Sequence, residues 1–200
     1  MKVLLVVPEI RLNDKPFEFP FWSGILASIV ENKGGDVAIL DLNALRMNYG
    51  GGNVPTDVIK EEISSENWDL IGVGGLTTTY KRLKQLIPLI HKISPNSILI
   101  AGGGWCSYNP DEILELIPEI NMICIGEGEE TFSEVYDEIK NKTLNFEKVK
   151  GLCINDNENS KFTEPRALIS DLDSVPTPHY DLFETDIYFK YSSYPYLSVA

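Results

Sequence analysis

Cysteine and histidine are scarce in this chain, and long apolar runs are missing from it. Three cysteines and two histidines occur among 200 residues, and no two cysteines form a CxxC pair. The sequence therefore offers neither a disulfide framework nor a cysteine-based structural zinc site. No apolar run approaches the ~20 residues of a membrane-spanning helix, and "MKVLLVVPEI" is too short for a signal peptide. We expect a first strand there, no membrane partner and a cytoplasmic location.

Positive charge is also in short supply. The chain has 17 lysines and arginines against 30 aspartates and glutamates, which leaves a formal net charge of -13. An acidic surface repels a phosphate backbone and lacks the basic patch of nucleic-acid-binding proteins. We therefore expect no nucleic-acid partner. The 43% hydrophobic content is sufficient for one globular core with an extension.

Short apolar runs alternate along the chain with segments of helical periodicity. The runs cover residues 2–7, 36–40, 69–75, 97–104 and 121–126. Such runs are typical of parallel strands that are covered on both faces. The helical stripes between them have i, i+3, i+4, i+7 spacing, as in Phe132, Val135, Tyr136 and Ile139. This pattern predicts an α/β protein with a flavodoxin-like (Rossmann-like), doubly wound parallel sheet of five strands in the order 2-1-3-4-5.

The pattern changes after residue 140. Two alternating stretches separated by the polar turn "NDNENS" predict a β-hairpin within residues 141–170. Residues 171–200 are rich in proline and aromatic residues and show no helical period, which predicts an extended linker. An interaction module is the alternative for this tail. We expect its aromatic side chains to cover an edge of this domain or of a further one; they are Phe183, Tyr188, Phe189, Tyr191, Tyr194 and Tyr196.

Glycines follow the third, fourth and fifth predicted strands. They are Gly74, Gly75, Gly102, Gly103, Gly104, Gly126 and Gly128. Ligands bind beyond the carboxyl ends of the strands in an open parallel sheet, and a missing Cβ lets a bulky ligand approach the backbone. The alternative is that these glycines serve tight turns and packing alone. The spacing matches neither GxGxxG nor GxxxxGK[ST], so the predicted ligand site is neither a dinucleotide fingerprint nor a P-loop.

Four segments resemble one known family. The segments "GVGGLTTTY", "LIAGGGW", "CIGEGEETFSEV" and "DLDSVPTPHYDLF" are similar to the N-terminal cobalamin-binding domain of cobalamin-dependent radical S-adenosylmethionine (SAM) enzymes. The similarity covers nearly the whole chain, and the combination of "GEGE" with "LDSVPTPHYDL" is its most specific part. The resemblance implies a cobalamin-binding Rossmann-like domain at 1–140, a hairpin extension at 141–170 and a linker at 171–200 toward a C-terminal radical SAM catalytic domain.

The resemblance also implies how cobalamin is held. In the wider fold a DxHxxG loop follows strand one, an SxL segment follows strand three and a GG pair follows strand four. Here Gly74, Gly75 and Leu76 are similar to the SxL segment, and Gly102-Gly103 is similar to the GG pair. The loop at residues 8–20 contains Glu9, a candidate cofactor contact, but no histidine. We therefore expect cobalamin with its own base displaced, with no protein imidazole on cobalt and no protein metal ligand.

Further candidates lie beside the glycines. Thr77, Thr78 and Thr79 are candidates to donate hydrogen bonds to the cofactor, with plain capping as the alternative. Trp105 is a candidate to cover the edge or the lower face of the corrin, or else packs its loop onto a helix. Glu127, between Gly126 and Gly128, is expected to border the rim of the site.

Two further features of this region concern chemistry. An acid–base pair of Glu127 and Glu129 is possible in principle, but we expect Glu129 and Glu130 to favour the start of a helix through its dipole. Cys106 is a lone loop cysteine, a kind that is usually inert.

The CxxxCxxC motif that holds an iron–sulfur cluster in radical SAM enzymes is absent from this sequence. We expect the [4Fe-4S] cluster and SAM only in the C-terminal catalytic domain, and no catalytic residue in this chain. The resemblance implies the cofactor-binding half of a methyltransferase that acts on an unactivated carbon of a small molecule or peptide. Radical cyclisation and ring contraction, which some relatives perform, remain open.

Other classes share the predicted topology. A free-standing corrinoid carrier would need the histidine that residues 8–20 lack. A phospho-receiver would need an acidic pair after strand one, an aspartate after strand three and a lysine after strand five, where this chain has Pro8-Glu9, Gly74 and Gly126. A flavin-binding domain would need a Ser/Thr-rich phosphate loop after strand one. Other flavodoxin-like ligand-binding or interaction domains remain alternatives.

Overall fold

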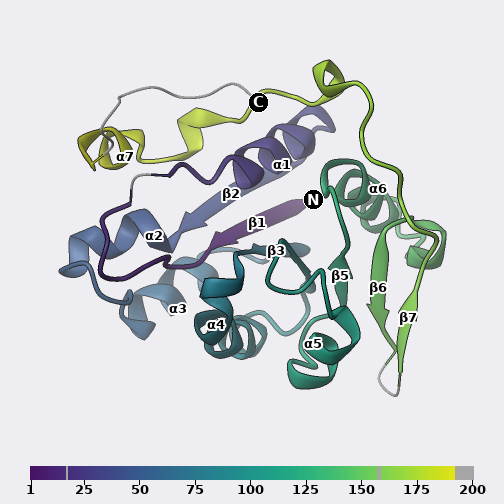
Figure 1. Ribbon diagram of the computed structural model, residues 1–200, viewed down its shortest axis with the longest axis horizontal. Coiled ribbons are helices and arrows are strands. Elements are labelled where there is room, and N and C mark those ends of the chain that lie inside the picture. The colour runs from purple at the N-terminus through teal and green to yellow at the C-terminus, as the bar shows by residue number, and fades with distance from the viewer. Residues whose placement is uncertain (17, 157–158, 192–200) are drawn as a thin grey trace.

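The computed structural model describes residues 1–16, 18–156 and 159–191 (Figure 1). Its centre is a seven-stranded sheet in the order β2-β1-β3-β4-β5-β6-β7. The first five strands are parallel, which confirms the predicted order 2-1-3-4-5; they are β1 (Lys2–Val7), β2 (Asp36–Asp41), β3 (Leu70–Gly74), β4 (Ile98–Gly102) and β5 (Met122–Cys124). The predicted hairpin, β6 (Leu152–Asn155) and β7 (Ser160–Phe162), continues the same sheet because β6 pairs antiparallel with β5.

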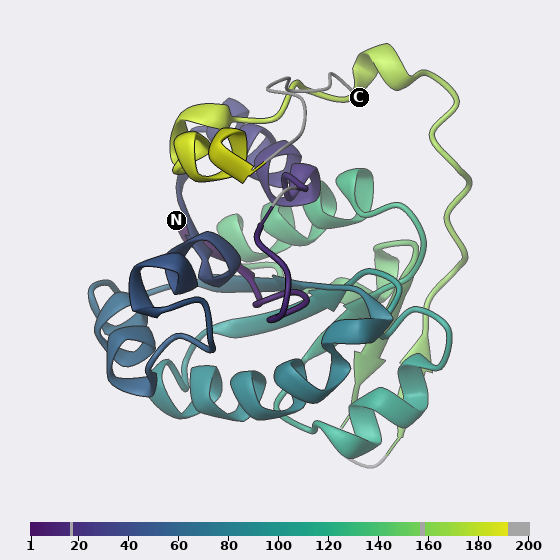
Figure 2. The same ribbon diagram turned by 60° about the vertical axis from the view of Figure 1, so that its left-hand side comes forward.

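Helices cover both faces of the sheet (Figure 2). One face packs against α1 (Phe21–Asn32) and α6 (Glu129–Lys140). The other face packs against α3 (Thr56–Ser64), α4 (Tyr80–Ile93) and α5 (Pro110–Leu116). Shorter elements complete the chain: α2 (Leu42–Leu45), η1 (Arg46–Tyr49), η2 (Thr77–Thr79), η3 (Phe146–Lys148), η4 (Leu172–Ser174), η5 (Tyr180–Leu182) and α7 (Thr185–Tyr191). No helix within the described ranges is long and apolar enough to cross a membrane.

The alternation of side chains along β1 divides the core into these two layers. Val3 and Leu5 belong to the layer beneath α1 and α6, whereas Leu4 and Val6 belong to the layer beneath α3, α4 and α5. All four residues are at most 3% exposed, so neither face of this strand meets solvent. A strand buried on both faces reads as a continuous apolar run, which is why the sequence predicted its position.

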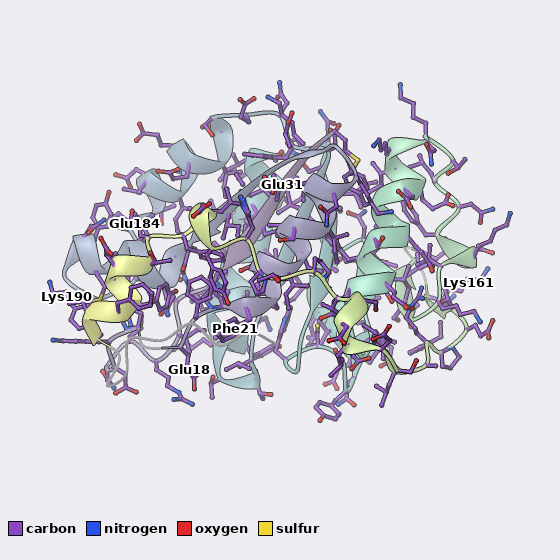
Figure 3. All side chains as sticks on the ribbon, turned by 90° about the horizontal axis from the view of Figure 1, so that it is seen from above. Glu18, Phe21, Glu31, Lys161, Glu184 and Lys190 are labelled. Atoms are coloured by element: carbon purple, nitrogen blue, oxygen red, sulfur yellow. The ribbon has the colours of Figure 1, made fainter. Side chains whose placement is uncertain are left out.

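The residues after β7 form a strap, defined as residues 163–184, that runs back across the molecule (Figure 3). Arg166 fastens the strap to α6 by donating to the carboxylates of Glu130 and Glu134. The strap then crosses α1, where the His179 N–H donates to the Gly24 carbonyl at 3.0 Å. A Cβ at Gly24 would lie 2.8 Å from the Cβ of Pro178, so the absence of a side chain there permits the close approach.

A short helix interrupts the extended tail that the sequence predicts. Helix α7 covers Thr185–Tyr191, and its Tyr188 is 2% exposed. The rings of Tyr188 and Phe183 lie 5.3 and 4.4 Å from the Phe19 ring, which precedes α1. A seven-residue helix has too little periodicity to stand out in a sequence, and this one gains from tertiary packing. The expected aromatic contacts of Tyr194 and Tyr196 lie outside the described residues.

Asp41 joins the tail to the sheet at the end of β2. The Tyr188 hydroxyl donates to Oδ2 of Asp41, while Oδ1 accepts from the N–H groups of Asn43 and Ala44 at 3.0 Å and caps α2. Burial raises the pKa of Asp41 to about 6, although these three hydrogen bonds act in the opposite direction. The folded protein therefore keeps a proton on Asp41 at pH values where the unfolded chain has released it.

We expect the stability of the protein to fall as pH rises from about 4 to about 6, to the extent that Asp41 contributes. The whole contribution is at most about 3 kcal/mol, since one pKa unit corresponds to ~1.4 kcal/mol. Asp41→Asn keeps the capping oxygen and removes the charge. Urea unfolding should therefore show that the free energy of unfolding of the variant, relative to that of the unmodified protein, is higher at pH 6.5 than at pH 4. A stability difference that does not change with pH would contradict this assignment.

Candidate functional site

A cavity of about 500 Å³ opens at the carboxyl ends of β1, β3, β4 and β5. Nine predicted site residues line it together: Gly74, Gly75, Leu76, Gly102, Gly103, Gly104, Gly126, Glu127 and Gly128. Its other walls are mainly apolar and include Phe19, Phe21, Leu26, Ile100 and Phe132. The cavity thus reaches from the glycine rim into the space beneath α1 and α6, as expected for ligand sites of open parallel sheets.

The glycines of the rim have two different structural roles. Gly103 has a φ of +92°, and a Cβ there would lie 2.4 Å from the Gly75 carbonyl oxygen. A Cβ on Gly74 would lie 2.5 Å from the Trp22 ring. Around Gly104 and Gly126, in contrast, no atom lies within 4 Å of an added Cβ. Packing therefore explains Gly74 and Gly103, and a φ of +83° explains Gly126, whereas Gly104 has open space and no positive φ.

The loop after β1 contributes a wall that the sequence analysis missed. Phe19 and Pro20 of this loop line the cavity together with Phe21 and Trp22, the first two residues of α1. The aromatic run "FPFW" at residues 19–22 is the sequence signal that indicates this wall. Tyr188 of α7 also lines the cavity, so the tail completes this wall.

Glu9 belongs to the same loop but is not among the residues that line the cavity. Its side chain is fully buried, and its carboxylate accepts from Nε and Nη2 of Arg82 at 2.6 and 2.8 Å. The Val54 N–H donates to the same carboxylate at 2.9 Å. These contacts fully engage Glu9 in joining β1 to α4 and to the loop before α3, so the geometry gives it a supporting role.

The three threonines also lie outside the cavity lining. Thr79 is 2% exposed, and its hydroxyl donates to the Leu76 carbonyl at 2.7 Å. The Thr77 hydroxyl donates to the Gly104 carbonyl at 3.3 Å, and Thr78 is exposed. The hydroxyls of Thr77 and Thr79 thus donate to backbone carbonyls, and neither makes a side-chain cap hydrogen bond at the start of η2 or α4.

Trp105 turns away from the cavity into the core beneath α4 and α5. It is 6% exposed, and its Nε1 donates to the Gly102 carbonyl at 3.0 Å. This position favours packing of the loop over contact with a ligand. Cys106 is buried beside it, and burial raises the pKa of its thiol to about 12.

The cavity lining has few side chains that could act as metal ligands. Cys124 lines it, but burial raises the pKa of this thiol to about 11, so it stays neutral near pH 7. No histidine lines the cavity, since His91 lies in α4 and His179 in the strap. Across residues 1–16, 18–156 and 159–191 no group of three or more His, Cys, Asp or Glu could hold a metal ion.

Two carboxylates border the cavity where α6 begins. Glu127 lies in the loop after β5, and its Oε2 accepts from the Ile169 N–H of the strap at 2.6 Å. Glu129 is the first residue of α6, as expected from its helix-starting role. The Oε2 of Glu129 is buried and has no hydrogen-bond donor among the described residues.

We expect Gly103→Ala to destabilise the protein by about 1–3 kcal/mol or more, because of the positive φ and the contact with Gly75. Gly104→Ala is the matched control, since an added Cβ meets no atom within 4 Å. It should change the free energy of unfolding by less than about 0.5 kcal/mol. Urea denaturation of both variants measures the difference, and equal stabilities would refute the proposed loop contact.

Comparisons with known proteins agree with this geometry. The family described as the B12 binding domain matches residues 12–136. The chain is 28% identical over 192 residues to the uncharacterized methyltransferase PH0819 of Pyrococcus horikoshii, covering 94% of this chain and 40% of the relative. It is 32% identical over 104 residues to the anaerobic magnesium-protoporphyrin IX monomethyl ester cyclase of Synechocystis, covering 52% of this chain and 21% of the relative.

Two solved structures share the fold. The cobalamin-dependent SAM radical enzyme OxsB, with aqua-cobalamin and SAM bound, superposes with a TM-score of 0.76 at 21% identity over 93% of this chain and 25% of OxsB. The radical SAM methyltransferase TsrM of Kitasatospora setae, with cobalamin and a [4Fe-4S] cluster bound, gives 0.68 at 20% identity over 88% of this chain and 31% of TsrM. The chain therefore spans two fifths or less of the length of these relatives.

A glycine rim over an apolar cavity, on a sheet of this order, thus coincides with a family match over more than half of the chain. The chain belongs to the B12 binding domain family, and it shares the fold of the cobalamin-bound radical SAM proteins OxsB and TsrM.

Proposed function

We propose that this domain holds cobalamin in the glycine-rimmed cavity with the nucleotide base displaced from cobalt and without a protein histidine ligand. The observation that carries the proposal is the cavity itself, which reaches from the strand ends into the apolar layer and has no histidine in its lining. In this proposal the domain is the cofactor-binding part of a radical SAM methyltransferase that acts on an unactivated carbon.

The residues of the cavity fit such a cofactor. A Cβ at Gly104 or Gly126 would project into open space, so glycine at these positions leaves backbone that a large ligand can approach. Deeper in the cavity, Leu26, Ile100 and Phe132 provide apolar walls for an aromatic base. A concave, mainly apolar pocket with few polar groups is typical of sites for small organic cofactors.

The loop that would face the lower side of the corrin is held in place and lacks strong ligands. The Ile10 N–H donates to Oδ1 of Asn43 at 3.0 Å. Arg46 is 1% exposed and donates to the carbonyls of Asp14 and, at 2.6 Å, Gly51. Held in this way, the loop presents Pro8, Ile10 and Phe19 to the cavity, and these side chains would exclude water rather than bind cobalt.

The other cofactors and the substrate of the reaction would be bound outside this chain. Cobalamin, when bound, supplies the transfer of a methyl group, and the protein supplies binding and orientation. The cysteines at 106, 124 and 153 are buried and do not form a CxxxCxxC motif, so we assign the [4Fe-4S] cluster and SAM to a C-terminal catalytic domain. That domain and a small-molecule or peptide substrate would be the partners, in the cytoplasm. The similarity to the Synechocystis cyclase favours ring closure as a second candidate.

Titration with hydroxocobalamin tests the proposal. The purified chain should retain the corrinoid through gel filtration and show the absorbance spectrum of cobalamin with its base displaced. Gly104→Trp should weaken binding at least ~10-fold, because the indole occupies space at the rim. Gly52→Trp is the matched control, since Gly52 also has open space around it but does not line the cavity.

Three results would count against the proposal. An imidazole-ligated or base-on spectrum would overturn the assignment of the lower face while keeping the cofactor. Binding by Gly104→Trp that equals binding by the unmodified chain would overturn the location. Absence of binding by the unmodified chain and by a longer chain that includes the catalytic domain would overturn the function.

A further inference from the structure

Phe19 is a residue of the cavity wall that the tail of the chain supports from behind. It lines the cavity and is 8% exposed. The rings of Tyr180, Phe183 and Tyr188 have their centroids 5.2, 4.4 and 5.3 Å from that of Phe19. The Phe21 ring, at 5.4 Å, is the other aromatic neighbour among the described residues. Most of the aromatic contacts of Phe19 therefore come from the other end of the sequence.

The loop that carries Phe19 is hydrogen-bonded on both sides of that residue. Arg46 holds the earlier part of the loop by donating to the Asp14 carbonyl. On the later side, the Phe21 N–H donates to the Phe19 carbonyl at 2.9 Å in the turn into α1. These bonds fix the course of the backbone. The direction of the Phe19 ring depends on the side chains that pack against it.

Tyr188 is the tail residue that links this packing to both the cavity and the sheet. It is 2% exposed and is itself part of the cavity lining. Its hydroxyl donates to Oδ2 of Asp41, at the end of β2, and α7 lies beside α2 (Figures 1 and 2). Its ring meets that of Phe19 edge-on, at an interplanar angle of 65°. A hydrogen bond thus anchors one end of Tyr188 while its ring packs against the wall, in a favourable aromatic geometry.

We propose that Tyr188 is a positioning residue of the cofactor site, which holds the Phe19 ring at the cavity so that the tail contributes to cofactor affinity. This inference rests on the proposed cobalamin site. Phe19 would make the apolar contact with the cofactor, and Tyr188 would act through Phe19. A side chain that is already held in its binding position loses less conformational freedom when the ligand binds, so this support raises affinity.

The affinity of variants for hydroxocobalamin tests this role. Tyr188→Leu removes the ring and should weaken binding about 3- to 10-fold, since an aromatic pair contributes a factor of that order. Tyr188→Phe keeps the ring and should recover most of the lost affinity. Ile187→Ala is the matched control, because Ile187 packs in the same cluster from the same helix but does not line the cavity. Its affinity should stay within about twofold.

Urea unfolding of the cofactor-free domain separates positioning from support of the fold. Tyr188→Phe leaves Oδ2 of Asp41 without this donor, so the urea midpoint should fall. The midpoint of Ile187→Ala should also fall, because the variant loses apolar contacts. Both variants should nevertheless bind more tightly than Tyr188→Leu. Affinity that follows the urea midpoint across the three variants would overturn the proposal and give Tyr188 a structural role.

A double-mutant cycle tests whether Tyr188 acts through Phe19. Phe19→Leu should weaken binding at least as much as Tyr188→Leu does. When both substitutions are combined, Tyr188→Leu should add less than about a twofold loss, because the ring that it positions is gone. Losses that multiply independently would overturn the positioning role.

Failure of this inference differs from failure of the proposed function. Equal binding by the unmodified chain and by all of these variants would overturn this inference alone. Absence of corrinoid binding by the unmodified chain and by a longer chain that includes the catalytic domain would overturn the proposed function, and this inference with it.

Discussion

The buried ion pair of Glu9 and Arg82 is the contact on which the rest of the site depends. It joins the end of β1 to α4, and the Val54 N–H adds a third element to the same carboxylate. Removing one partner of a buried, hydrogen-bonded ion pair typically lowers the free energy of unfolding by about 3–5 kcal/mol. The pair therefore fixes the start of the loop after β1. The following residues can therefore turn back over the strand ends and carry Phe19 and Trp22 to the cavity.

The cavity results from three segments that meet only in the folded protein. The loops after β3 and β4 touch through the backbones of Gly75 and Gly103, which closes one side of the rim. The aromatic run at residues 19–22, where α1 begins, forms another wall. The strap crosses α1, and α7 then brings Tyr188 to the same space, so the segment expected to be a linker is also part of the site.

Two of the acidic residues at the cavity illustrate how neighbouring positions acquire different roles. Glu127 and Glu129 are two residues apart in "GEGEE". Glu127 meets a backbone N–H of the strap, whereas Oε2 of Glu129 meets no donor among the described residues. The local sequence accounts for the helix start at Glu129, but the difference between the two carboxylates arises from the strap, which comes from a distant part of the chain.

The sequence predicted those features that a single segment of the chain is sufficient to specify. Apolar runs predicted the parallel strands and their order, and a polar turn predicted the hairpin. Glycines directly after three predicted strands also predicted the rim of the cavity, since parallel strands end at one edge of a sheet. The sequence could not show that β6 joins β5, that α7 forms, or that Glu9 and Trp105 turn away from the cavity.

The difference has one physical reason. The amino-acid sequence by itself determined which segments are buried and where glycines leave the backbone without side chains, because both follow from local residue type. The tertiary structure decided which side chains face the cavity, because that depends on packing partners such as Arg82 for Glu9 and the Gly102 carbonyl for Trp105. Those partners are distant in sequence or depend on the final course of a loop, and only the folded chain brings them together.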